Sequence, residues 1–359
     1  MVKPTTLAEV ARIAGVSTAT VNRVIKRAGY VSADARLRIE AAIRETRYRP
    51  NALARELRKQ RSMTIGHVVS AITANPFFAG VARGAEEEAL DKGFKTLLFN
   101  HNGSRERERQ GLERFMESRV DAVLLTVAAA RDDVAMLIDA RIPVVQIERI
   151  ATRDAPSVTV DNAVGALEAM HHFIELGHRR IALVGGDPEQ VYHGDPLMRA
   201  VEDERLSAYR AGLSAAGIPW NPDHERLGQY YRHEDGAGVQ GYQHMRALLD
   251  GRERPTAVFA TCDILAAGVL QAIYEAGLRV PDDISVIGFD DTLAINLAPR
   301  LTTVAQPMDE LGRQGFRLAL AQIEGHGVPQ SIRLPSHLVR RDSAGPVRAD
   351  ALQTRRKRA

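Results

Sequence analysis

The chain has 359 residues, of which 45% are hydrophobic and 26% charged, a composition typical of soluble globular proteins with more than one domain. It contains no run of about 18 apolar residues and no apolar segment at its N-terminus. We therefore expect no membrane span and no secretory signal, and we predict a cytoplasmic protein. A single cysteine, Cys262, excludes an intramolecular disulfide and a metal site made of several cysteines.

Charge is distributed unevenly along the chain. Residues 1–61 contain 14 Lys and Arg against 5 Asp and Glu, a balance of +9, whereas the whole chain carries +3. The remainder therefore carries −6. A small basic domain joined to an acidic body is the charge pattern of a DNA-binding head.

Residues 5–26 contain a predicted helix-turn-helix. Apolar residues at helical spacing define one face of its first helix: Leu7, Val10, Ala11 and Ala14. Gly15 gives the backbone freedom that a sharp turn needs, and Ser17 is a favourable N-cap for the second helix. The outer face of the second helix is short, polar and basic: Thr18, Ala19, Asn22, Arg23 and Lys26. Such a face suits a helix in the DNA major groove, although two ordinary amphipathic helices in a small bundle are the alternative.

A third helix is predicted within residues 29–48 and is capped near Ser32. Pro50 ends it, and Asn51 can cap a short following helix. Because this following segment is basic and only about two turns long, it would be marginal alone and could fold on DNA. A solvated linker is the alternative for this segment.

These segments share a motif with a known family. Residues 6–24 read T-L-x-x-V-A-x-x-A-G-V-S-x-x-T-V-x-R-V, and residues 48–57 read Y-x-P-N-x-x-A-x-x-L. The sequence resembles the lactose-repressor/purine-repressor (LacI/GalR) family of bacterial transcription regulators, and the resemblance extends to about Asp342. It implies a homodimer on a pseudo-palindromic double-stranded DNA operator, with hinge helices in the minor groove where Leu57 wedges into the central base step. The DNA-binding residues that it implies are Thr6, Ser17, Thr18, Ala19, Thr20, Asn22, Arg23, Asn51, Ala54 and Leu57.

The recognition helix departs from the family pattern. Thr18 and Ala19 are small residues at the two positions that read bases most directly in the family, and Asn22 stands where serine is usual. Threonine and alanine can contact a thymine methyl group, whereas asparagine can pair with adenine. The resemblance therefore does not define the operator sequence.

The rest of the chain alternates predicted strands and helices. Strands are predicted at Thr64–Ser70, Thr96–Asn100, Ala122–Val127, Val144–Ile147, Ile181–Gly185, Ala257–Ala260 and Ser285–Phe289. Helices are predicted at Phe77–Lys92, Arg105–Ser118, Ala163–Leu176, Glu204–Ala216 and Leu265–Ala276. This order predicts parallel α/β architecture, in which ligands bind beyond the carboxyl ends of the strands. The resemblance implies the complete fold class: an all-α helix-turn-helix head plus an α/β periplasmic-binding-protein-like (type I) core of two parallel-sheet subdomains with a ligand in the cleft.

The predicted domain boundaries follow from these elements. Residues 1–48 form the helix-turn-helix domain, and residues 49–62 form the hinge helix or linker. Residues 63–342 form the effector-binding and dimerisation core. Its N-subdomain covers about 63–160 and 294–326, and its C-subdomain covers about 161–293 and 327–342. Residues 343–359 end in RRKR without an apolar period, so we expect a disordered basic tail.

Four loops at predicted strand ends carry the candidate effector site. Arg205 could bind a hydroxylated or anionic ligand through its planar fork. From the residues alone, a surface arginine paired with Glu202 or Glu204 is the favoured alternative, but the resemblance assigns Arg205 to the effector. Asp290 matches the effector-binding aspartate of the family, and a carboxylate opposite an arginine suits sugar hydroxyls. The effector-binding residues implied together are Asn75, Phe77, Phe78, Arg205, Tyr231, Cys262, Asp263 and Asp290.

Several of these positions have a second interpretation. Phe77 and Phe78 are expected to pack in the wall of the site more than to touch the ligand. Cys262 replaces the asparagine common in the family, and its thiol is a weak hydrogen-bond donor. Tyr230 and Tyr231 could supply a stacking ring, Asp291 is expected to be structural, and Asp161 is expected to be an N-cap.

These observations predict a sequence-specific DNA-binding transcription regulator, a repressor controlled by a sugar or sugar derivative; the alternative effector is a nucleobase or other metabolite that acts as a corepressor. No phosphate-binding loop, dinucleotide motif or base–nucleophile pair occurs, so we expect neither an enzyme nor a cofactor. His171 and His172 lack a carboxylate at metal-binding spacing, so no metal is expected. The rival classes are a sugar-binding protein, an enzyme on an α/β core, and an architectural DNA binder without an effector.

Overall fold

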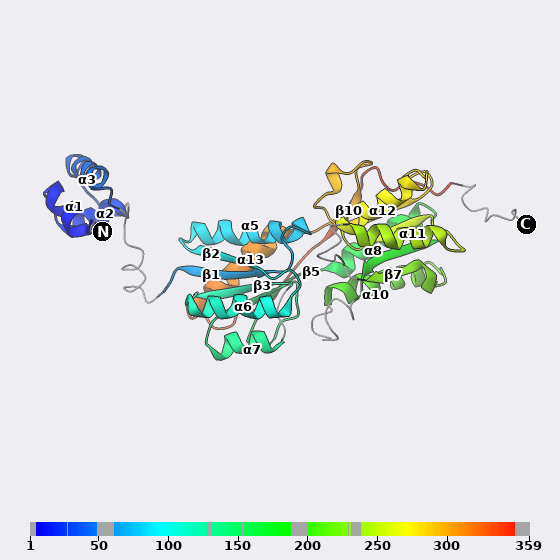
Figure 1. The fold of residues 1–359 in the computed structure, drawn as a ribbon, viewed down its shortest axis with the longest axis horizontal. Coiled ribbons are helices and arrows are strands. Elements are labelled where there is room, and N and C mark those ends of the chain that lie inside the picture. The colour runs from blue at the N-terminus through cyan, green and yellow to red at the C-terminus, as the bar shows by residue number, and fades with distance from the viewer. Residues whose placement is uncertain are drawn as a thin grey trace, which may run out of the picture. The chain divides into compact units, whose positions relative to one another are not determined.

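The computed structural model of the protein describes residues 5–26, 28–48, 61–127, 131–152, 154–187, 200–228, 230 and 238–348. The chain divides into two compact units, Met1–Ser62 and Met63–Ala359 (Figure 1). Over the described residues, no helix has both the length and the apolar character needed to cross a bilayer.

The first unit contains the helices α1 (Leu7–Ala14), α2 (Thr18–Ile25) and α3 (Ala33–Thr46). Gly15 ends α1 in the left-handed conformation with φ 64°, which only glycine adopts without strain. The predicted caps Ser17 and Ser32 accept hydrogen bonds from the backbone amides of residues 20 and 35. The core of the three helices consists of Val10, Ala11, Ala14, Val21, Val24, Ile39 and Ala42.

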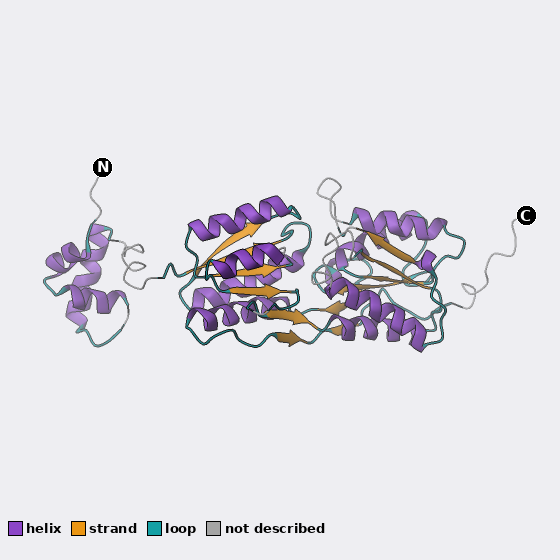
Figure 2. Cartoon of the chain, turned by 90° about the horizontal axis from the view of Figure 1, so that it is seen from below, coloured by secondary structure: helices purple, strands orange, loops and turns teal. Residues whose placement is uncertain are grey.

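The second unit contains two six-stranded sheets with helices on both faces (Figure 2). The first sheet has the order β11-β5-β4-β3-β1-β2, and all its neighbouring strands are parallel. Its strands are β1 (Thr64–Val69), β2 (Lys95–Asn100), β3 (Ala122–Thr126), β4 (Val144–Ile147), β5 (Ser157–Val160) and β11 (Ile332–Leu334). Its helices are α5 (Pro76–Asp91), α6 (Arg105–Glu117), α7 (Arg131–Asp139) and α13 (Met308–Ile323).

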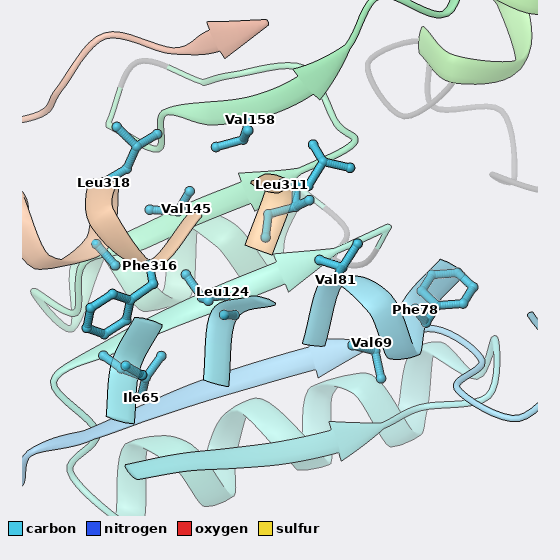
Figure 3. Packing of buried hydrophobic residues seen from close by; sticks show 14 of the residues in the cluster. Ile65, Val69, Phe78, Val81, Leu124, Val145, Val158, Leu311, Phe316 and Leu318 are labelled. Atoms are coloured by element: carbon cyan, nitrogen blue, oxygen red, sulfur yellow. The ribbon is translucent and has the colours of Figure 1, made fainter. Parts of the chain in front are cut away.

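The core of the first sheet lies under α5 and α13. Side chains of both helices, among them Val81 and Phe316, pack against Ile65 and Leu124 of the strands (Figure 3). The two helices approach closely because Gly84 has no side chain: a Cβ atom there would lie 2.0 Å from the Asp309 carbonyl oxygen. A second cluster, under α6 and α7, covers the opposite face.

The second sheet has the order β12-β10-β9-β8-β6-β7, and only β12 runs antiparallel to its neighbour. Its strands are β6 (Ile181–Gly186), β7 (Glu225–Gly228), β8 (Ala257–Ala260), β9 (Ser285–Asp290), β10 (Thr302–Ala305) and β12 (His337–Val339). Its helices are α8 (Asn162–Glu175), α10 (Ala200–Ala215), α11 (Val239–Asp250) and α12 (Asp263–Glu275). The pair α8 and α10 covers one face of the sheet, and the pair α11 and α12 covers the other. The predicted fold class is confirmed.

The sheets correct the predicted subdomain boundaries. The segment 294–305 was expected in the first subdomain, but β10 pairs with β9 and β12 in the second sheet. Conversely, β11 was expected in the second subdomain, yet it pairs with β5 in the first sheet. Three- and four-residue strands carry too little local pattern to reveal their sheet, which long-range pairing decides.

The predicted disorder from residue 343 onward was wrong for residues 343–348. Ser343 is fully buried, where its hydroxyl donates to the Val286 carbonyl at 2.6 Å and accepts from the Thr302 amide at 2.8 Å. The Val347 amide donates to the Leu176 carbonyl. Because these contacts use a hydroxyl and main-chain groups, they produce no apolar periodicity from which the order of this segment could be predicted. Residues 349–359 lie outside the described part of the chain.

Candidate functional site

The predicted DNA-binding residues of α2 divide into two groups. Ser17 and Thr20 are joined by capping: the Ser17 hydroxyl accepts from the Thr20 amide at 3.2 Å. By contrast, Thr18, Ala19 and Arg23 are exposed, opposite the buried side of the helix. Asn22 is half-buried, and Thr6 caps α1. The exposed side of α2 therefore presents the residues expected to meet base edges, whereas Asn51, Ala54 and Leu57 lie outside the described residues.

Arg205, on α10, is held in a fixed orientation by polar contacts. Its Nε and Nη2 donate to Asn162 Oδ1 at 3.0 and 2.8 Å, and its Nη1 donates to the Thr261 carbonyl at 2.7 Å. The guanidinium carbon lies 3.8 Å from the centre of the Phe289 ring. The side chain is almost fully buried, and these contacts hold its planar fork in one orientation.

Asp290, at the end of β9, brings several distant segments together. Its Oδ1 lies 4.0 Å from Arg205 Nη2 and accepts from Gln306 Nε2 at 2.6 Å. Its Oδ2 accepts from Nδ2 of Asn75, the N-cap of α5, at 3.2 Å. Burial raises the pKa of the Asp290 carboxyl to about 7, although nearby Arg205 lowers it. The φ of 110° places this residue in a conformation that side chains rarely adopt, as functional residues often do.

Glu148 is a buried member of the site that the sequence analysis missed. Its Oε1 accepts from the Val160 amide at 2.6 Å, and its Oε2 accepts from Asn162 Nδ2 at 3.4 Å. Burial raises the pKa of the Glu148 carboxyl to about 7, against the lowering effect of Arg205. We refer to Glu148, Asn162, Arg205 and Asp290 as the Arg205 cluster. Glu148 directly follows β4, and this position at a strand end was the available signal.

Two predicted effector residues have other surroundings. Asp263 is fully buried: its Oδ1 accepts from Thr303 Oγ1 at 2.7 Å, and its Oδ2 accepts from the Thr292 and Leu293 amides at 2.7 and 3.1 Å. Oδ1 therefore ties α12 to β10, and Oδ2 ties α12 to the segment after β9. Cys262 is buried before α12, and burial, with a contribution from Asp290, raises the pKa of its thiol. A protonated thiol offers the site only weak hydrogen bonds.

The remaining candidates are placed as follows. Phe77 and Phe78 are buried in the first-sheet core as an edge-to-face pair, with ring centres 5.5 Å apart. Asp161 caps α8, as predicted, and Asp291 forms a 2.8 Å ion pair with Arg341. Tyr231 lies outside the described residues.

The Arg205 cluster offers a ligand a planar cationic donor beside carboxylate acceptors. Such a set can bind hydroxyl groups that both donate and accept hydrogen bonds. Within the described ranges, no group of three or more His, Cys, Asp or Glu residues is arranged to hold a metal ion. The cluster is a candidate ligand-binding site.

Comparison with known proteins identifies the family. Residues 6–51 match the bacterial regulatory proteins of the lacI family, and residues 170–344 match a periplasmic binding protein-like domain. The ribose operon repressor of Escherichia coli (strain K12) is 36% identical over 344 residues, which cover 94% of this chain and 99% of that repressor.

Two solved structures have the same architecture. The Lac repressor dimer bound to operator and the anti-inducer ONPF is similar with a TM-score of 0.78 and 29% identity, over 96% of this chain and 100% of that chain. A LacI family transcriptional regulator from Enterococcus faecium with bound ribose is similar with a TM-score of 0.68 and 30% identity, over 79% of this chain and 100% of that chain. Because the similarity to the ribose operon repressor spans almost the whole sequence, the chain belongs to the lacI family of bacterial regulatory proteins.

Proposed function

We propose that this regulator is a repressor whose operator affinity is controlled by a small neutral sugar bound at the Arg205 cluster. The observation that carries the proposal is the placement of Arg205. Three hydrogen bonds and the Phe289 ring fix its guanidinium, and the Asp290 carboxylate lies 4.0 Å from it. A donor and an acceptor at this separation suit neighbouring hydroxyls of one sugar ring.

The charges at the site favour a neutral ligand. Arg149 is buried next to Glu148 and donates to its carbonyl oxygen at 2.7 Å. When the carboxyls of Glu148 and Asp290 are ionised, the two arginines Arg149 and Arg205 balance their charges. An anionic sugar would compete with these carboxylates for the guanidinium groups, whereas hydroxyls can bind both partners. D-ribose is the first candidate, since one relative is a ribose operon repressor and a similar regulator was solved with bound ribose.

Sugar binding would act on DNA through the arrangement of the two subdomains. In this mechanism the sugar stabilises one orientation of the subdomains, which sets whether the hinge segments of two chains can meet at the operator centre. Leu57 is the residue expected to enter the minor groove there. A pseudo-palindromic operator needs two heads, so the proposed active form is a homodimer.

A thermal-shift screen of the purified full-length chain tests the proposal. The panel contains neutral sugars, sugar phosphates, sugar acids and nucleobases. A bound ligand raises the melting temperature, and D-ribose at 100 times its dissociation constant stabilises the folded chain by about 2.7 kcal/mol. The rise should disappear in Arg205→Ala and persist in Arg300→Gln, which removes an exposed ion pair with Asp342.

Three outcomes would count against this function. A sugar response that survives in Arg205→Ala would place the site elsewhere. A response confined to sugar phosphates or acids would contradict the charge argument. A response to nucleobases alone would favour the corepressor alternative. A confirmed ligand is then titrated into an operator-binding assay, where weaker DNA binding identifies an inducer.

A further inference from the structure

Arg333, on the first-sheet strand β11, contacts two carboxylates on helices of the second sheet. Its Nη2 lies 3.0 Å from Asp161 Oδ1 and 3.2 Å from both carboxylate oxygens of Glu204. Asp161 is the N-cap of α8, and Glu204 lies on α10. One guanidinium therefore joins the start of α8 to α10 and to a strand of the other sheet.

Each of these carboxylates directly precedes a member of the Arg205 cluster. Asn162 follows Asp161, and Arg205 follows Glu204. Successive helical side chains point about 100° apart, so Glu204 stays partly exposed while Arg205 is buried. The two helices share an apolar core and are linked by three polar contacts: the Arg205–Asn162 hydrogen bonds inside, Arg333 outside, and the Asn162 backbone amide, which donates to the Glu204 carboxylate.

The contact between β11 and Glu204 is the part of this arrangement that depends on Arg333. The Asp161 amide already donates to the Leu334 carbonyl at 2.8 Å, and Ser336 Oγ donates to the Asp161 carbonyl at 2.6 Å. These bonds hold the start of α8 against the β11 segment without the ion pair. Burial raises the pKa of the Glu204 carboxyl, and the neighbouring Arg333 favours its ionised form.

We propose that Arg333 is a positioning residue of the effector site, which fixes α10 against α8 and so sets the position of Arg205 relative to Asn162. Because β11 belongs to the first sheet and α10 packs on the second, a change in the orientation of the sheets alters the Arg333–Glu204 contact. The ion pair thus links subdomain orientation to the sugar-binding arginine. Its consequence for sugar affinity rests on the proposed function, whereas the link between the helices does not.

Hydrogen–deuterium exchange of the full chain without ligand tests the link itself. In Arg333→Gln, amides in the first turn of α8 and around residues 204–206 of α10 should exchange about two- to fivefold faster, the range expected for a partly exposed ion pair. Arg333→Lys should restore part of the protection, because all three contacts come from one guanidinium nitrogen, which the ammonium of a shorter side chain can replace in part. The control Arg300→Gln removes a comparable exposed pair and should leave both segments unchanged. Unchanged exchange in Arg333→Gln would overturn the proposal.

Two further measurements separate positioning from general stability. The effects of Arg333→Gln and Glu204→Gln on the unfolding midpoint should be non-additive, whereas those of Arg333→Gln and Arg300→Gln should add. By calorimetry, D-ribose should bind Arg333→Gln about two- to fivefold more weakly than wild type, with partial recovery in Arg333→Lys. Equal affinities in wild type and Arg333→Gln would refute the positioning role. Absence of D-ribose binding to the wild-type chain would instead count against the proposed function, and the exchange data would still decide the link.

Discussion

The Arg205 guanidinium is stacked on Phe289, with its central carbon 3.8 Å from the ring centre. Both side chains are buried, and the ring comes from β9, the strand that ends at Asp290. A buried cation over an aromatic face gains about 2 kcal/mol, and the ring also limits the rotamers of the arginine. The stack therefore fixes the donor while the same strand places the acceptor.

Phe289→Leu should weaken sugar binding by about tenfold, because it keeps apolar volume under Arg205 but removes the aromatic face. The control is Phe259→Leu, which alters a buried ring in the same core, 6.4 Å from the Phe289 ring centre. Both variants should lose comparable stability in urea, about 1–2 kcal/mol. Calorimetric titration with D-ribose should separate them, and equal affinities in the two variants would refute a role for the stack.

The buried carboxyls of Glu148 and Asp290 predict a pH dependence of stability. The pKa of Glu148 rises from 4.5 to about 7 on folding, and that of Asp290 rises from 3.8 to about 7, chiefly through burial. The folded chain thus binds these protons more tightly than the unfolded chain. The resulting stabilisation is fully present below the unfolded-state pKa and is lost as the pH rises through about 7.

Glu148→Gln tests this dependence, since glutamine resembles the neutral acid at every pH. Relative to wild type, the free energy of unfolding of the variant should increase by about 1–3 kcal/mol between pH 5 and pH 8. Burial lowers the pKa of His67 and of His101 to about 4, so these two histidines make the free energy of unfolding rise with pH. Both wild type and Glu148→Gln contain them, so their contribution cancels in the difference between the two proteins. Urea unfolding at pH 5, 6, 7 and 8 measures the difference in unfolding free energy between Glu148→Gln and wild type. Glu113→Gln, on the surface of α6, is the control for the loss of one charge. A pH-independent difference would contradict the argument.

Asp263 and Asp290 should respond differently to the same substitution. Asp263→Asn places an amide against the Thr292 and Leu293 amides or the Thr303 hydroxyl, so stability should fall by about 1–3 kcal/mol with little change in sugar affinity. Asp290→Asn should be milder for stability, because the donors to Asp290 are the side-chain amides of Asn75 and Gln306, which can turn to offer their oxygens, but it should weaken D-ribose binding at least about tenfold. Urea unfolding and calorimetry on both variants check this. The reverse pattern would make Asp263 the ligand contact.

Local signals explain what the sequence predicted well. The capping serines Ser17 and Ser32 and the turn glycine Gly15 act within one helical turn, so their roles could be read directly and are observed. The long strands and helices of the core follow from apolar runs and helical periodicity in the same way. The fold class then followed from the order of these elements and from the family resemblance.

Long-range contacts explain what the sequence did not reveal. Asn162 is a single polar residue at a helix start, and its partner Arg205 lies 43 residues further on. Glu148 belongs to no motif, and its role appears only when the end of β4 meets the start of α8. The sheet assignment of β11 likewise depends on pairing with β5 across more than 170 residues. No local pattern encodes such contacts.

We predict that two copies of the chain meet along the edge strand β2. It is the outermost strand of the first sheet in the described part of the chain, and Leu97 and Leu98 on it are 41% and 45% exposed. Successive strand residues point to opposite faces, so apolar side chains project from both sides of this edge. Leu90 on α5, which packs beside β2, is 65% exposed. Exposed apolar groups along a free strand edge are typical of a surface that another chain covers.

Leu98→Glu should therefore convert the proposed dimer to a monomer, because it would bury two carboxylates, one from each chain, without cationic partners. Sedimentation velocity should show a dimer for wild type and a monomer for the variant at the same concentration. Val328→Glu, which places the same charge on an exposed valine after α13, should remain dimeric. Sugar binding should survive in Leu98→Glu, since the Arg205 cluster lies within one chain, while operator affinity should fall steeply because a monomer offers only one head. A dimeric Leu98→Glu variant would place the interface elsewhere on the chain.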